Sequence, residues 1–119
     1  MKEFPQDLRG AALDWAVGVC EGMPPNYFDA DDKAFTDDEG MLFCPSTNWS
    51  QGGPIIEREK ITLNTTHFPN TSNVTWVARH PNVLFSYFGE TALIAAMRCY
   101  VASKFGDDGI EVPDSLLEE

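Results

Sequence analysis

The amino-acid sequence predicts an α+β domain, in which an antiparallel sheet of about four to five short strands is packed by an N-terminal and a C-terminal helix. Helical spacing of apolar residues near both ends of the chain favours the two helices. Runs of β-branched and aromatic residues between them, separated by turn residues, favour the strands. A short interrupted helix is expected in the middle. With 119 residues, the chain suits a single domain covering 1–119.

The N-terminal helix is expected to run from Asp7 to Glu21. Asp7 is a suitable cap for its start, and Gly22 is a suitable end because Pro24 follows closely. Its apolar residues recur at intervals of three and four: Leu8, Ala12, Trp15, Ala16, Val19 and Cys20.

The C-terminal helix is expected from Thr91 to Phe105, with Glu90 or Thr91 as its cap and Gly106 at its end. One stripe of this helix contains the residues Leu93, Met97, Tyr100, Val101 and Lys104, which Ile94 and Phe105 widen. This pattern predicts that one face of the helix packs on the sheet.

Between the helices, residues 26–45 predict two short strands joined by an acidic turn. Ser46 or Thr47 can cap the middle helix, which Gly52-Gly53-Pro54 is expected to interrupt before it resumes from Ile55 to Lys60. Further strands are expected at 61–63, 74–77 and 83–87, a short edge segment at 110–113, and a frayed end at 115–119.

The charge of the chain limits its partners. Eight Lys and Arg stand against 19 Asp and Glu, which gives a formal net charge of -11. Such a chain repels nucleic acid, so no direct nucleic-acid partner is expected. A basic protein is a better-matched partner, although an acidic surface also serves solubility alone. No segment suits a membrane span, so no membrane partner is expected.

The sequence contains no complete metal-binding or catalytic motif. A calcium loop starting at Asp29 would need glycine at the position of Ala34 and an acidic ligand at that of Gly40. His67 and His80 have no neighbours at zinc-ligand spacing and are expected at the surface. The three cysteines are expected to be reduced thiols. We therefore predict no metal, no cofactor and no catalytic residue.

The segment 49–59 is the candidate ligand-binding site. It combines an aromatic side chain, two glycines that let a ligand approach the backbone, and charged residues, and an arginine of the C-terminal helix could join it to clamp a carboxylate or phosphate. The alternative is a helix break whose apolar residues fill the core, with that arginine in a salt bridge to Glu21, Glu57 or Glu59. The candidate residues are Trp49, Gly52, Gly53, Glu57, Arg58 and Arg98.

Three blocks of the sequence carry a family resemblance: 8–17 with Cys20-Glu21-Gly22, 46–61, and 93–106 with Val112-Pro113. They cover about half of the chain, and together they resemble the NinX-like accessory proteins of lambdoid bacteriophages. The resemblance implies a phage accessory protein with helices on an antiparallel sheet, and it implies no established catalytic residue. Gly89-Glu90-Thr91-Ala92 departs from the expected Gly-Pro-Thr-Pro and could loosen the start of the last helix.

Together these features predict a non-catalytic accessory protein that acts in the cytoplasm of the host bacterium, where it binds and modulates a host protein. One alternative is a protein that binds or sequesters a small nucleotide-like ligand around Trp49–Arg58. A hydrolase is a more distant one. A homodimer through an apolar helix face is also conceivable.

Overall fold

The computed structural model describes residues 2–22, 28–29, 34–36, 42–67, 74–106 and 109–112. The helices are the 3₁₀ turn η1 (Pro5–Asp7), α1 (Gly10–Cys20), α2 (Trp49–Glu59) and α3 (Ala92–Phe105). The strands are β1 (Lys2–Glu3), β2 (Phe28–Asp29), β3 (Ala34–Thr36), β4 (Leu42–Phe43), β5 (Thr62–His67), β6 (Val74–Arg79), β7 (Tyr87–Gly89) and β8 (Ile110–Glu111).

The predicted α+β class is confirmed, with a helix near each end and a third helix in the middle. The expectation of one sheet with four to five strands is wrong. In the described residues, the strands form three separate antiparallel sheets, ordered β1-β8, β2-β3-β4 and β5-β6-β7. Lys2 and Glu3 pair with Glu111 and Ile110, so the C-terminal edge segment joins the N-terminal strand. It does not join β5-β6-β7, which we call the main sheet.

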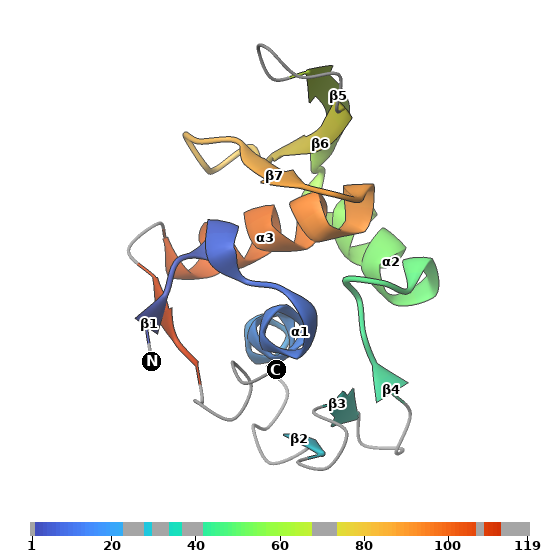
Figure 1. The fold of residues 1–119 in the computed structure, drawn as a ribbon, viewed down its shortest axis with the longest axis vertical. Coiled ribbons are helices and arrows are strands. Elements are labelled where there is room, and N and C mark those ends of the chain that lie inside the picture. The colour runs from blue at the N-terminus through green and yellow to red at the C-terminus, as the bar shows by residue number, and fades with distance from the viewer. Residues whose placement is uncertain are drawn as a thin grey trace.

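Helix α3 occupies the centre of the molecule, with β6 and β7 on one side and α1 on the other (Figure 1). It also contacts α2 and η1. Nine of its 14 residues are buried, and they cover most of the circumference of the helix: Ala92, Leu93, Ala95, Ala96, Met97, Cys99, Tyr100, Val101 and Ala102. The helix bounds and the Thr91 cap are as predicted, and the Thr91 hydroxyl accepts a hydrogen bond from Ile94 N–H. The prediction of a single apolar stripe is wrong, because small alanines let neighbours approach the helix from several sides.

Helix α1 begins three residues later than predicted. Asp7 belongs to η1, and Arg9 precedes the helix without a side-chain capping bond. Gly10 has φ +56°, a conformation that favours glycine, and this turn separates η1 from α1. The predicted end is confirmed, since Glu21 is the C-cap and Gly22 follows with φ +81°.

Helix α2 continues through Gly52-Gly53-Pro54, so the predicted interruption is wrong. Gly53 has no Cβ, which removes the clash that normally keeps the residue before proline out of the helical conformation. The cap is also one or two residues later than predicted: the Asn48 side chain accepts a hydrogen bond from Ser50 N–H at 2.9 Å.

The sheet β5-β6-β7 confirms the strands predicted at 61–63 and 74–77 and extends both. The strand predicted at 83–87 is mostly wrong, because β7 starts only at Tyr87 and a turn closed by Val83 N–H and His80 C=O precedes it. Ala78 and Tyr87 are buried on the face toward α3. Residues 26–45 contain three short strands where two were expected. Residues 30–33 and 37–40 of the acidic turn, like the predicted frayed end 115–119, lie outside the described residues.

Gly52 allows α2 to lie against its neighbours. A Cβ at this position would stand 2.5 Å from the Pro45 carbonyl oxygen and 2.6 Å from Leu93 Cδ2. We predict that Gly52→Ala lowers the free energy of unfolding by about 1–3 kcal/mol, in the range of other overpacked sites. Urea unfolding followed by circular dichroism would measure this change.

Gly53→Ala is the matched control, because its Cβ would have its nearest neighbour, Trp49, at 3.9 Å. The gain in helix propensity and the contact with Pro54 oppose each other there, so a change below about 1 kcal/mol is expected. Equal losses in the two variants would contradict the close approach of α2.

Candidate functional site in the polar contacts around α3

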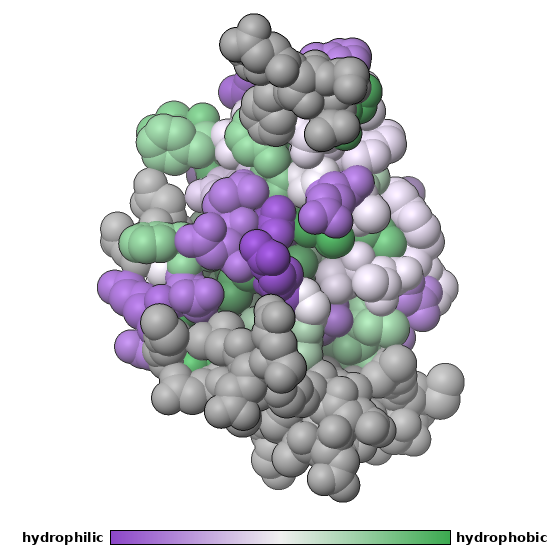
Figure 2. Space-filling model, in the orientation of Figure 1, coloured by the Kyte–Doolittle hydropathy of each residue, from purple (hydrophilic) through white to green (hydrophobic). Residues whose placement is uncertain are grey.

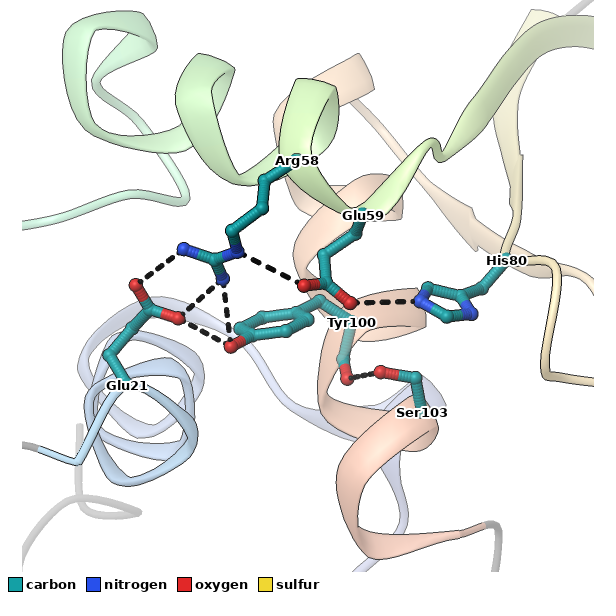
Figure 3. A network of polar contacts seen from close by, with 6 residues as sticks. All are labelled: Glu21, Arg58, Glu59, His80, Tyr100 and Ser103. Carbon is teal, nitrogen blue, oxygen red and sulfur yellow. Dashed lines mark hydrogen bonds and ion pairs between the residues drawn. The ribbon is translucent and has the colours of Figure 1, made fainter.

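Five side chains from four parts of the chain form what we call the Arg58 network: Glu21, Arg58, Glu59, His80 and Tyr100 (Figure 3). Arg58 donates from Nη1 and Nη2 to the two carboxylate oxygens of Glu21, at 3.2 and 2.7 Å. Its Nε donates to Glu59 at 3.0 Å, and its Nη2 also lies 3.1 Å from the Tyr100 hydroxyl. The network therefore joins the end of α1, the last turn of α2 and α3.

Tyr100 lies at the centre of this network. Its hydroxyl donates to Glu21, and its backbone carbonyl accepts from the hydroxyl of Ser103 (Figure 3). The guanidinium carbon of Arg58 is 5.6 Å from the ring centroid, and the Lys104 ammonium is 5.9 Å from it. Both distances are suitable for cation–π attraction.

His80 extends the network to the main sheet. Its Nε2 lies 3.0 Å from Glu59 Oε1, while Asn82 N–H donates to its Nδ1 at 3.0 Å. Because Nδ1 accepts, the proton belongs on Nε2, which donates to Glu59. His80 is only 7% exposed, so the expected surface position is wrong for this residue. It is confirmed for His67, which is exposed at the end of β5.

The hydrogen bonds of the network stabilise the charged forms of Glu21, Glu59 and Arg58. Partial burial acts to raise the pKa of Glu21, but hydrogen bonds from Arg58 and Tyr100 outweigh it and lower the pKa below its ordinary value. The hydrogen bond from His80, together with Arg58, lowers the pKa of Glu59. Hydrogen bonds to Glu21 and Glu59 raise the pKa of Arg58, and burial raises that of Tyr100. Glu21, Glu59, Arg58 and Tyr100 therefore keep the charges that these groups ordinarily have at neutral pH.

Arg98 lies elsewhere on α3 and has backbone partners. Its Nε donates to the Leu8 carbonyl at 2.8 Å and its Nη1 to the Phe88 carbonyl at 2.5 Å. Burial, together with the positive charge of Arg9, lowers its pKa. The expected salt bridge from Arg98 to a glutamate is wrong, because Arg58 takes Glu21 and Glu59 instead. Arg98 thus fastens the segment before α1 and strand β7 to the central helix.

Among the predicted ligand-binding residues, those of α2 divide between surface and interior. Trp49 is 57% exposed and Glu57 is also exposed. Gly52 is buried against Pro45 and Leu93, whereas Gly53 lies near the Trp49 ring. Arg58 and Arg98 have different partners. Ligand binding by these residues stays a prediction.

Asp14 is a buried carboxyl group that the sequence pattern did not single out. Its side chain is 8% exposed on α1, and its Oδ1 accepts from Ser46 N–H at 2.9 Å. This bond joins α1 to the turn before α2. Burial raises the pKa of Asp14 to about 6, although the bonds from Ser46 act in the opposite direction. Its position after an alanine-leucine run was the only sequence signal for burial.

None of the three cysteines is in a disulfide. Burial raises the pKa of Cys20 and of Cys99 to about 12, so both thiols are protonated at neutral pH and are poor nucleophiles. Within the described ranges, no group of three or more His, Cys, Asp and Glu side chains is placed to hold a metal ion.

The segment between β6 and β7 exposes two large apolar side chains, one of which, Leu84, is the most exposed of this kind among the described residues. Leu84 is 89% exposed and Phe85 is 57% exposed. In Figure 2 this segment is green at the upper left, beside a band of hydrophilic side chains. Between this segment and the N-terminus lies a groove of about 390 Å³, which we call the Phe85 groove, lined by Phe4, Pro5, Gln6, Phe85, Ser86, Tyr87 and Phe88.

The structure defines a small α+β domain built round one central helix, in which the described polar clusters connect its elements. Residues 6–104 match the model of the family described as Bacteriophage P22, NinX, and the chain belongs to this family. The resemblance carried by its three sequence blocks is thereby confirmed. No curated protein matches the chain. Within the part of the chain that the structure describes, no helix has the length and apolar character needed to cross a bilayer.

The raised pKa of Asp14 makes the stability of the protein depend on pH. The folded state keeps this proton up to about pH 6, whereas the unfolded carboxyl loses it near its ordinary value of 3.8. Stability therefore falls as pH rises from about 4 to 6, by a total of about 3 kcal/mol from this group, and stays lower above that window.

Asp14→Asn removes the titration and keeps an oxygen acceptor for Ser46. Relative to this variant, the wild type is expected to lose stability between pH 4 and 6, as measured by urea unfolding at each pH. The comparison cancels the contributions of the other carboxyl groups. Parallel pH profiles for the two proteins would contradict a buried, titrating Asp14.

Proposed function

We propose that the protein is a non-catalytic phage accessory protein that binds a basic host protein, with the Phe85 groove as the anchor of the contact. The observation that carries this proposal is the exposure of large apolar side chains at one place on a strongly acidic chain. Phe4 is 54% exposed and Phe85 is 57% exposed, and both line the groove. Apolar patches of this kind commonly mark protein-binding surfaces.

The chemistry of the groove suits a side chain from a partner protein. Aromatic rings at its rim bury large apolar area at a small entropic cost, which is typical of residues that dominate binding energy. The backbone beneath it is held by Gln6, whose side chain bonds both the N–H and the C=O of Phe88. A fixed floor reduces the ordering that binding would otherwise require.

The net charge of -11 supports a basic partner. Long-range attraction speeds the encounter between opposite charges, and the apolar anchor then slows dissociation. The absence of catalysis is part of this proposal. It is supported by Cys20 and Cys99 remaining protonated and by the Arg58 network satisfying its own charges.

The test compares two equally exposed aromatic residues. The immobilised protein would first be used to isolate a partner from bacterial lysate, and the purified partner would then be titrated by calorimetry. We expect Phe85→Ser to weaken binding by about 30-fold, as for a typical hot-spot residue. Binding by the wild type is also expected to weaken as salt rises, since salt screens the attraction.

Trp49→Ser is the matched control, because Trp49 is exposed to the same extent as Phe85 but lies on α2. Its affinity for the partner should equal that of the wild type. A partner that binds Phe85→Ser as tightly as the wild type would refute the groove as anchor. Loss of binding only in Trp49→Ser would place the contact on the segment 49–59 instead.

A further inference from the structure

The two outer strands of the main sheet differ in how their edges are covered. At β7, the Gln6 side chain donates to Phe88 C=O at 3.0 Å and accepts from Phe88 N–H at 2.9 Å. Arg98 donates to the same carbonyl. These contacts occupy the backbone groups that another strand would need, so the edge of β7 is closed to strand pairing.

The register shows which groups of β5 point outward. The backbone N–H and C=O of Phe88 bond Gln6 and therefore point away from β6. Its opposite residue in β6, Val77, then directs its own backbone groups away from β7 and toward Asn64, its partner in β5. Backbone direction alternates along a strand, so Thr62, Asn64 and Thr66 face β6. The N–H and C=O groups of Leu63, Thr65 and His67 therefore point outward, and we call them the β5 edge. Among the described residues, no hydrogen bond reaches these outward groups.

The β5 edge lacks the features that protect exposed strands. Strand β5 has the sequence Thr-Leu-Asn-Thr-Thr-His, which contains no proline, lysine or acidic residue. Its six residues pair with β6 without a bulge. In edge strands of this length, a charged residue, a proline or a bulge normally prevents pairing with another chain. Figure 1 shows β5 at the end of the molecule that lies farthest from α1.

The charge of the main sheet differs from that of the chain as a whole. Its 15 residues, six in β5, six in β6 and three in β7, contain no acidic residue, and Arg79 is their only Lys or Arg. Two copies of a chain with net charge -11 repel each other over most approaches. The main sheet is a surface where they can meet without opposing carboxylates.

We propose that the β5 edge pairs with the β5 edge of a second copy, which joins the two three-stranded sheets into one six-stranded antiparallel sheet. A two-fold axis at Thr65 places Thr65 opposite itself and Leu63 opposite His67 of the second copy. Both pairs use outward groups, so the pairing makes about six main-chain hydrogen bonds. This self-complementarity is the reason for choosing a second copy over a foreign strand. The proposed dimer leaves the Phe85 groove to the host partner.

The contact is small, because pairing one strand of each copy buries much less surface area than a standard protein interface does. The dimer is therefore weak and reversible, and it forms as protein concentration rises. Salt strengthens it by screening the repulsion between the two acidic copies. This response is opposite to that expected for the host partner, so the two proposals can be tested separately.

Sedimentation equilibrium of the wild type over a wide concentration range, at low and moderate salt, tests the dimer. Thr65→Pro removes only an outward N–H, a position at which an edge strand tolerates proline. Because two of about six hydrogen bonds are lost, the dissociation constant of the dimer should rise at least about tenfold. Thr65→Lys, which places like charges on the two-fold axis, should also give monomers.

Val74→Lys is the matched control, because it adds the same charge to the exposed end of the neighbouring strand, away from the axis. This variant should dimerise like the wild type, and circular dichroism should show native folding for all the variants. A wild type that stays monomeric at every concentration and salt would overturn the proposal. A dimer that persists unchanged in Thr65→Pro and Thr65→Lys would also overturn it.

Discussion

The structure depends on the burial of α3 over most of its circumference. A central helix must present small residues where neighbours approach closely, and Ala95, Ala96 and Ala102 are almost completely inaccessible. Larger side chains fill the space between them, with Tyr100 and Met97 fully enclosed. Helix α1, helix α2 and strands β6 and β7 are each placed by the surface of α3 that they cover. The small sheets could not bury enough apolar surface without it.

The polar contacts follow from this arrangement. Enclosing a helix leaves polar ends of neighbouring elements near a dry interior, where unpaired groups are costly. Arg98 satisfies two such carbonyls, and the Arg58 network closes the opening between the ends of α1, α2 and β6. Bidentate geometry suits arginine in both places. These contacts account for the charged residues that cross between elements, and they do not involve the outward groups of β5 or the aromatic rings of the groove, the two surfaces that we propose for partners.

The sequence was sufficient for the element types, because periodicity and turn residues are local signals. Thr91–Phe105 was correct nearly to the residue, since cap, apolar spacing and Gly106 agree. The sequence could not show that α3 is enclosed, because its alanines carry no amphipathic signal. It also predicted a break in α2 that the structure does not have, because Gly53 relieves the strain of Pro54 and Gly52 fits beneath Pro45 and Leu93. Close approach of this kind depends on distant residues.

The candidate site was predictable only in part. Arg58 and Arg98 were singled out as candidate ligand-binding residues, and the structure shows that both bond other parts of the chain. Their partners Glu21 and Leu8 are far away in the sequence, so local patterns could not predict these contacts. The burial of His80 and Asp14 was not visible, because a polar residue gives no periodic signal. Gln6 was likewise missed, although its amide is the group that closes the edge of β7.

Native-state hydrogen exchange measures the central claim most directly, because it reports the opening free energy of each backbone amide. If α3 organises the fold, its amides from Ala96 to Ala102 exchange slowest and only through global unfolding, while the outward amides of Leu63, Thr65 and His67 exchange fastest in dilute protein. Exchange of the α3 amides at free energies well below that of global unfolding, with another element slower, would contradict the account.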